Sequence, residues 1–162
     1  MAKEPRQTPF YQLHVALNRA EPQIWRRILV PSHLSLADLH TVLQVTMGWQ
    51  NYHLHLFQVG DQEYGLPDPE WDMPLKDERR VKLSSVLSSP EVQIRYDYDL
   101  GDGWTHTISL EKIEVWSQDV WAPQCFDGQR ACPPEDCGGV PGYHHLITVL
   151  RDKGDPEYQE LR

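Results

Sequence analysis

The stretch IWRRILVPSHLSLADLHTVLQVTMGW, residues 24–49, decides how this chain folds. Residues 24–30 are rich in branched and aromatic side chains, which favour a strand, and Pro31 would end that strand. Ser35 and Asp38 have the spacing of a helix capping box, and Gly48 stands where a helix would end. Between these caps the apolar residues recur at helical spacing: Leu36, Leu39, Leu43 and Met47, with Val42 beside them. We therefore predict a strand followed by an amphipathic helix.

Alternating apolar residues predict more strands on both sides of this stretch. Before it, residues 10–18 alternate and would form an antiparallel hairpin with residues 24–30. After it, we expect strands at 53–59, 63–66, 92–98 and 104–110, with a short helical turn at 83–87. Asp102-Gly103 predicts the tight turn of the second hairpin. The apolar parity changes between Leu110 and Ile113, which predicts a β-bulge.

The resulting order is strand, strand, helix, strand, short strand, long hairpin, Cys-rich loop and C-terminal helix. That order predicts an α+β fold with a mainly antiparallel sheet, in a single domain over residues 1–162 with residues 1–9 flexible. Its strand–strand–helix–strand start resembles a β-grasp arrangement. Residues 67–82 are acidic, proline-containing and aperiodic, so we interpret them as an exposed loop. We expect the C-terminal helix after Gly142, and a last helix capped at Asp155-Pro156.

Composition and charge limit the classes of function. The chain has 162 residues and a formal net charge of −9, and it contains 40% hydrophobic residues, as soluble globular proteins do. Binding to the phosphates of bulk nucleic acid needs clustered Lys and Arg, so the charge disfavours it and leaves a protein partner open. No run of about 18 apolar residues predicts a membrane span, and no signal peptide begins the sequence, so we expect a cytoplasmic protein.

A Cys-rich loop, CFDGQRACPPEDCGGVPGY at residues 125–143, contains every cysteine of the chain. Its prolines and glycines predict a shaped loop and not a helix or strand. Cytoplasmic thiols stay reduced, so three of them close together favour a metal over a disulfide. Zinc takes four ligands, and we predict a structural zinc site of Cys125, Cys132, Cys137 and His106. His144, His145, Glu135 and Asp136 are alternatives for the fourth ligand, and three buried apolar cysteines are the alternative to a metal.

Acidic residues lie in two places near these cysteines. We predict a binding rim for a cationic ligand or a metal-bound water from five of them: Asp97, Asp99, Asp102, Glu135 and Asp136. The plain alternative for the first three is a tight hairpin whose carboxylates accept backbone hydrogen bonds. His53 and His55 share a strand face and would either share a metal or pack half-buried. We interpret His40 as an exposed or half-buried helix residue.

Five stretches together resemble the plasmid pRiA4b ORF-3-like family, also known as TnpR-like passengers of mobile elements. They are PQIWRRILVP at 22–31, LADLHTVLQVTMGW at 36–49, HLHLF at 53–57, YDYDLGDGWTHTISLEK at 96–112 and the Cys-rich loop. The resemblance extends from about Tyr11 to Tyr158. It implies the fold class, the importance of the last two motifs and a mobile-element setting. It implies no activity, and we find no serine-recombinase pattern that would support a resolvase.

Two functional hypotheses follow. The first is a small metal-stabilised binding or accessory module associated with mobile elements. The second is a zinc-dependent hydrolase in which Asp102, Asp99 or Glu135 acts as general base beside an open metal position. A closed site of four protein ligands would favour the first hypothesis, and three ligands with a water in a cleft would favour the second.

Overall fold

A single sheet of eight strands organises the computed structural model, which describes residues 7–70, 72, 74–116 and 122–162. The strands are β1 (Thr8–Leu17), β2 (Ile24–Pro31), β3 (His55–Val59), β4 (Gln62–Gly65), β5 (Lys76–Asp77), β6 (Gln93–Tyr98), β7 (Trp104–Trp116) and β8 (Gln124–Gln129). Their order across the sheet is β5-β4-β3-β6-β7-β1-β2-β8. All neighbours pair antiparallel except β4 and β5, which are parallel. The predicted α+β class with a mainly antiparallel sheet is confirmed.

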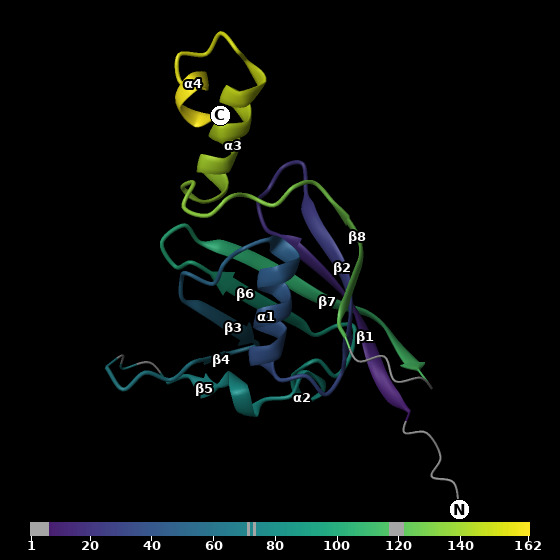
Figure 1. Ribbon diagram of the computed structural model, residues 1–162. Coiled ribbons are helices and arrows are strands. Elements are labelled where there is room, and N and C mark those ends of the chain that lie inside the picture. Colours follow the sequence, from purple (N-terminus) through teal and green to yellow (C-terminus); the bar gives the residue numbers. More distant parts are fainter. Residues whose placement is uncertain (1–6, 71, 73, 117–121) are drawn as a thin grey trace, which may run out of the picture.

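The helices are α1 (Leu36–Met47), η1 (Glu78–Arg80), α2 (Leu83–Val86), α3 (Gly139–Arg151) and α4 (Tyr158–Leu161). Figure 1 shows α1 lying across one face of the sheet, with α3 and α4 beyond one end of it. The core is formed between α1 and the sheet, where the apolar residues of both are buried. No helix of the described ranges is long and apolar enough to cross a membrane.

The ends of α1 are the predicted ones. The Ser35 side chain accepts a hydrogen bond from the Asp38 backbone N–H, and the Asp38 carboxylate accepts one from the Ser35 backbone N–H. Gly48 ends the helix in the left-handed conformation with φ 76°. The predicted apolar face is fully buried at Leu39 and Leu43. The capping box and the buried face are confirmed.

The predicted β-bulge is also present. Leu13 of β1 pairs with Leu110 of β7, but Gln12 pairs with Lys112, so Glu111 is the extra residue. The bulge moves the Glu111 side chain into reach of the Arg27 guanidinium, 2.7 Å away. The parity change in the sequence therefore located the bulge correctly.

Other segments differ from the prediction. The order strand–strand–helix–strand is as expected, but β6 and β7 lie between β3 and the β1–β2 hairpin, so the β-grasp likeness is limited to the order of elements. Residues 1–6 of the segment expected to be flexible lie outside the described residues, whereas Thr8 and Pro9 belong to β1. The last helix begins at Tyr158, and Asp155 caps the turn before it by accepting from the Glu157 N–H.

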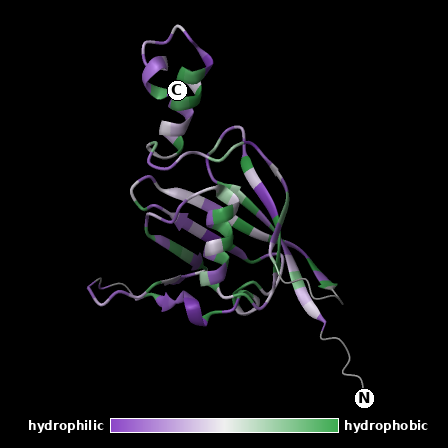
Figure 2. Cartoon of the chain, in the orientation of Figure 1, coloured by the Kyte–Doolittle hydropathy of each residue, from purple (hydrophilic) through white to green (hydrophobic). Residues whose placement is uncertain are grey.

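Two stretches interpreted as loops contain regular structure. The Cys-rich loop begins as β8, which pairs with β2, and ends as α3, which begins at Gly139 and not after Gly142. The segment 67–82 contains β5 and η1, whose residues are hydrophilic (Figure 2). Even so, Glu78 in this segment is only 1% exposed. A sequence pattern that reads hydrophilic does not reveal that one carboxylate points inward.

Candidate functional site

The turn between β6 and β7 and the loop before α3 contact each other closely. The Gly138 N–H donates to the Asp102 carboxylate at 3.1 Å. Gly139 has φ 70°, and a Cβ at this position would lie 2.4 Å from the Asp102 carbonyl oxygen. Only glycine fits this backbone conformation and this close approach. The glycine pair of the Cys-rich loop therefore positions the neighbouring acidic residues against the hairpin.

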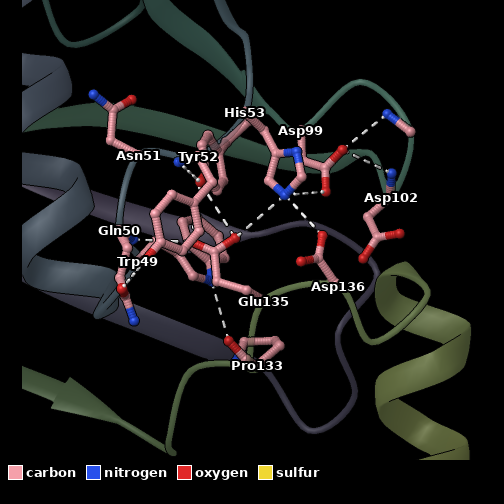
Figure 3. Close-up of polar contacts among 12 residues, drawn as sticks. Trp49, Gln50, Asn51, Tyr52, His53, Asp99, Asp102, Pro133, Glu135 and Asp136 are labelled. Atoms are coloured by element: carbon pink, nitrogen blue, oxygen red, sulfur yellow. Dashed lines mark hydrogen bonds and ion pairs between the residues drawn. The ribbon is translucent and has the colours of Figure 1, made fainter.

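His53, just before β3, lies where these two segments meet (Figure 3). Its Nε2 is 2.7 Å from Asp136 Oδ1, 3.5 Å from Asp99 Oδ2 and 3.8 Å from Glu135 Oε2. His53, Asp99 and Asp136 each offer a ligand atom, and these atoms lie within 4.8 Å of one another. Among the described residues, no other group of three His, Cys, Asp or Glu meets this distance. We call His53, Asp99 and Asp136 the His53 cluster.

The His53 cluster concentrates negative charge. The Asp99 side chain is 9% exposed, that of Glu135 14% and that of Asp136 68%. In the part of the chain that the structure describes, these three carboxylates lie within 4 Å of His53 Nε2 and form no ion pair with Lys or Arg. Three carboxylates around one imidazole repel one another unless a cation or a proton lies between them. The cluster therefore has the charge of a cation site.

The backbone holds both aspartates of the cluster in an uncommon conformation. Asp99 has φ 58° and Asp136 φ 56°, both left-handed. Aspartate tolerates this region better than most residues do, although it costs conformational energy. Asp99 is further fixed because its Oδ1 accepts from the Gly101 and Asp102 N–H groups, which leaves Oδ2 directed at His53. Such strain is found at ligand-binding sites more often than elsewhere.

Glu135 is held by groups other than His53. It accepts hydrogen bonds from the Tyr98 hydroxyl at 3.0 Å and from the Gln50 N–H at 2.9 Å. Burial, followed by the hydrogen bond to Glu135, raises the pKa of Tyr98 to about 12, so the hydroxyl stays a donor at neutral pH. Next to it, the Trp49 ring stacks on Tyr98, with ring centroids 4.9 Å apart, and its indole N–H donates to the Pro133 carbonyl. Tyr98 and Trp49 thus anchor the loop that carries Glu135 and Asp136.

Four of the five predicted rim residues meet here: Asp99, Asp102, Glu135 and Asp136. Asp97 does not. It is one residue from Tyr96 and Tyr98 in β6 and so points to the opposite face of the sheet. There it accepts from the Thr105 hydroxyl at 2.6 Å and pairs with Arg95. The two loops thus bring four of these carboxylates together and Asp97 lies apart from them, while their binding of a cationic ligand stays a prediction.

The predicted zinc ligands are not gathered in the structure. No three of Cys125, Cys132, Cys137 and His106, all described residues, have ligand atoms within 4.8 Å of one another. Cys125 is exposed on β8. The Cys132 sulfur accepts from the Arg26 guanidinium at 3.0 Å. Burial raises the pKa of Cys132 and raises that of Cys137 to about 11. Zinc at these thiols would require rearrangement and loss of their protons, and it stays a prediction.

His106, the predicted fourth ligand, is a core residue. It is fully buried, its Nδ1 bonds the Tyr96 carbonyl at 3.1 Å, and its ring meets the Trp49 ring edge-on at 5.2 Å. Burial lowers the pKa of His106 to about 4, so it is neutral at physiological pH. The alternative ligands His144 and His145 lie on α3, where they contact the Glu21 N–H and the Glu157 carboxylate.

A second polar cluster escaped prediction because its members are buried among apolar residues. His40, interpreted as exposed or half-buried, is only 6% exposed and stacks on His55 with ring centroids 3.4 Å apart. His55 in turn bonds the buried Glu78. His53 and His55 therefore have separate partners and share no ligand set. The two-residue spacing in HLHLF was the available signal, but it cannot show that His53 precedes the strand.

Comparison with known proteins identifies the family of the chain and two relatives of similar sequence. The profile of the plasmid pRiA4b ORF-3-like protein family matches residues 9–162. An uncharacterised protein, y4hQ, from Sinorhizobium fredii is 40% identical over 151 residues, which cover 92% of this chain and 77% of the relative. The crystal structure of a protein of unknown function, MM3350, from Methanosarcina mazei has a TM-score of 0.87 at 37% identity. The match covers 95% of this chain and 88% of that protein.

Proposed function

Because the chain belongs to the plasmid pRiA4b ORF-3-like family, whose relatives named above have no described activity, we propose a function from its own side chains. It is a small accessory module that binds a divalent cation at His53, Asp99 and Asp136. The cation links the β6–β7 turn to the loop before α3 and so stabilises the surface that these loops form. This is the metal-stabilised module expected from the sequence, with the metal at a different place.

The convergence of Asp99 and Asp136 on the Nε2 of His53 carries the proposal. Two ligands of a tetrahedral zinc ion, each about 2.1 Å from it, are about 3.4 Å apart. The distance from His53 Nε2 to the Asp99 carboxylate, 3.5 Å, is close to this separation, and the distance to the Asp136 carboxylate, 2.7 Å, is shorter. One imidazole and two carboxylates suit Zn²⁺ or Mn²⁺ better than Ca²⁺, which prefers oxygen alone. Small shifts of the exposed Asp136 side chain would admit the ion.

The hydrolase remains the second candidate because one further carboxylate lies beside the cluster. Glu135 Oε2 is 3.8 Å from His53 Nε2, within reach of a water on a cation bound there. However, Glu135 already accepts two hydrogen bonds, from Tyr98 and Gln50, which hold its carboxylate in the loop. The Asp102 carboxylate already accepts a hydrogen bond from the Gly138 N–H, and Asp99 serves as a ligand of the proposed cation. The binding module is therefore the better-supported function.

The setting and the partner are part of the proposal. The description of the family names a plasmid, which supports an association with mobile elements. The net charge of −9 favours a protein partner over bulk nucleic acid. A cation that joins two surface loops would present such a partner with a rigid surface, in the way that structural metals do in small domains.

Calorimetric titration of the purified, chelator-treated protein with ZnCl₂ or MnCl₂ tests the proposal. We expect about one equivalent to bind, and Asp136→Asn to weaken binding by roughly 10-fold to 100-fold, the range known for disturbed metal sites. Asp61→Asn, in the β3–β4 turn away from the cluster, is the matched control and should bind as the wild type does. Undiminished binding by Asp136→Asn, with loss in Cys132→Ser, would place the metal at the cysteines instead.

A further inference from the structure

A cavity of about 380 Å³ lies beside β3, on residues that the cation site does not use. Its described wall is mostly apolar and includes Leu54, Leu66 and Leu100, which are 57%, 52% and 48% exposed. Three strongly exposed leucines around one hollow are unusual on a monomeric surface, where such patches mark binding sites. The volume is that of a site for a small molecule.

One polar side chain of the cavity wall, His55, is fixed from behind. Its Nε2 lies 2.8 and 3.0 Å from the two oxygens of Glu78, which is 1% exposed. An ionised carboxylate can only accept, so the Nε2 proton is donated to Glu78. Among the described residues, the other ring nitrogen of His55, Nδ1, has no hydrogen-bond partner. It does not belong to the buried side-chain atoms that lack a partner, so it is not fully enclosed. His55 Nδ1 is therefore a ring nitrogen of the cavity-wall residue that has no partner in the described part of the chain.

The ring behind His55 holds it in this position. His40 belongs to a closed ring of four hydrogen bonds. The Gln44 amide donates to the Tyr96 hydroxyl, and this hydroxyl donates to His40 Nδ1. His40 Nε2 donates to the Asn51 side-chain oxygen, and the Asn51 N–H donates to the Gln44 side-chain oxygen. Both nitrogens of His40 are thus occupied, and burial lowers its pKa to about 4. The ring plane of His40 makes an angle of 8° with that of His55, so His40 forms a neutral, rigid surface on which that imidazole stacks.

The other polar residue of the wall is Asp68. One of its oxygens accepts from the Glu70 N–H, and as a carboxylate it offers acceptors only. The described cavity wall therefore presents leucine and proline carbon, an imidazole ring and a carboxylate. An anion would be repelled here, whereas a molecule with an apolar body and a positively charged donor would match both parts.

We propose that this cavity binds a small apolar primary amine, whose ammonium group pairs with the Asp68 carboxylate and whose hydrocarbon body covers the exposed leucines. The site is separate from the cation site and does not depend on it. Its ligand is recognised by charge at one end and by burial of apolar area at the other.

Three matched six-carbon probes test this proposal on the whole chain: hexylamine, hexanol and hexanoate, titrated at neutral pH and followed by methyl NMR. We expect hexylamine to shift the methyl signals of Leu54, Leu66 and Leu100, hexanol to bind more weakly, and hexanoate to bind least. Asp68→Asn should weaken hexylamine binding roughly 5-fold or more, as expected for a lost charged hydrogen bond, and should leave hexanol unchanged.

Control variants separate this site from the cation site. Leu66→Trp, which fills the cavity mouth, should weaken both hexylamine and hexanol, whereas Asp61→Asn should weaken neither. Asp136→Asn should bind hexylamine as the wild type does. If Asp136→Asn abolishes hexylamine binding while Asp68→Asn preserves it, the amine occupies the His53 cluster and the proposal is wrong. Equal or tighter binding of hexanoate, or no leucine shifts at millimolar hexylamine, would also overturn it.

Discussion

His53 Nε2 lies 2.7 Å from Asp136 Oδ1, and this contact joins the segment before β3 to the loop before α3. The two residues come from the separate motifs HLHLF and CPPEDCGG, which are far apart in the sequence. Their contact depends on the anchoring of the second motif by Trp49, Tyr98 and Gly139. Changes at these anchors are therefore expected to disturb the site from a distance.

Gly139→Ala should destabilise the protein strongly. The added Cβ would lie 2.4 Å from the Asp102 carbonyl oxygen, and alanine disfavours the φ of 70°. Gly60→Ala is the matched control, because Gly60 has φ 57° but no atom within 4 Å of the added Cβ. The control should lose about 1–2 kcal/mol of unfolding free energy, the cost of the left-handed conformation alone. Urea denaturation that finds equal losses for both variants would refute the close approach of the two loops.

Acid should destabilise the protein through His106. The pKa of this histidine is lowered from 6.5 to about 4 by burial, so between these pH values the unfolded chain binds a proton that the folded protein does not. The stability that neutral His106 contributes is present above pH 6.5 and is lost as the pH falls toward 4. His106→Leu should therefore reduce the pH dependence of the unfolding free energy by at most about 1.4 kcal/mol per pH unit.

Urea denaturation at several pH values between 4 and 7 would measure this difference. His33→Gln, at an exposed position, is the control and should change the slope little. An unchanged slope in His106→Leu would show that the imidazole is already charged or solvated in the folded protein.

The face of α1 gives a test of the core. Leu39 and Leu43 are fully buried, so Leu43→Ala or Leu39→Ala should cost roughly 2–5 kcal/mol of unfolding free energy. Val45→Ala on the opposite side, where Val45 is 78% exposed, should cost far less. A loss below about 1 kcal/mol for either leucine would mean that the helix packs through another face.

Local patterns in the sequence predicted the fold well. The capping residues and the four apolar positions of α1 all lie within one short helix. The bulge at Glu111 changes side-chain parity within one strand. Such features depend on neighbouring residues, which the sequence displays directly. The pairing of β3 with β6 and of β1 with β7 depends on contacts between distant segments, so the order of elements could not settle it.

The candidate site was only partly predictable for the same reason. Asp99, Asp102, Glu135 and Asp136 were expected at a rim because loop carboxylates often line sites, and the two loops do meet. The sequence predicts that His53 and His55 share a strand face, but in the structure His53 contacts Asp136 and His55 contacts Glu78. The cysteines were predicted as ligands because thiols are common zinc ligands. Their positions depend on the pairing of β8 with β2, which a segment rich in proline and glycine does not predict.

The charge of the chain predicts its behaviour toward DNA. With a net charge of −9, the protein offers few clustered cations to replace the counterions of the phosphate backbone. We expect no sub-micromolar binding to random-sequence duplex at low salt in a fluorescence anisotropy titration. Tight binding that weakens steeply with added salt would contradict this expectation.

X-ray absorption at the zinc edge tests the cation site most directly. The protein is loaded with one equivalent of Zn²⁺, and the atoms around the ion are identified from their distances. The site at His53, Asp99 and Asp136 predicts nitrogen and oxygen neighbours alone, at about 2.0–2.2 Å. Sulfur neighbours at about 2.3 Å would place zinc at the cysteines and contradict the site proposed at His53.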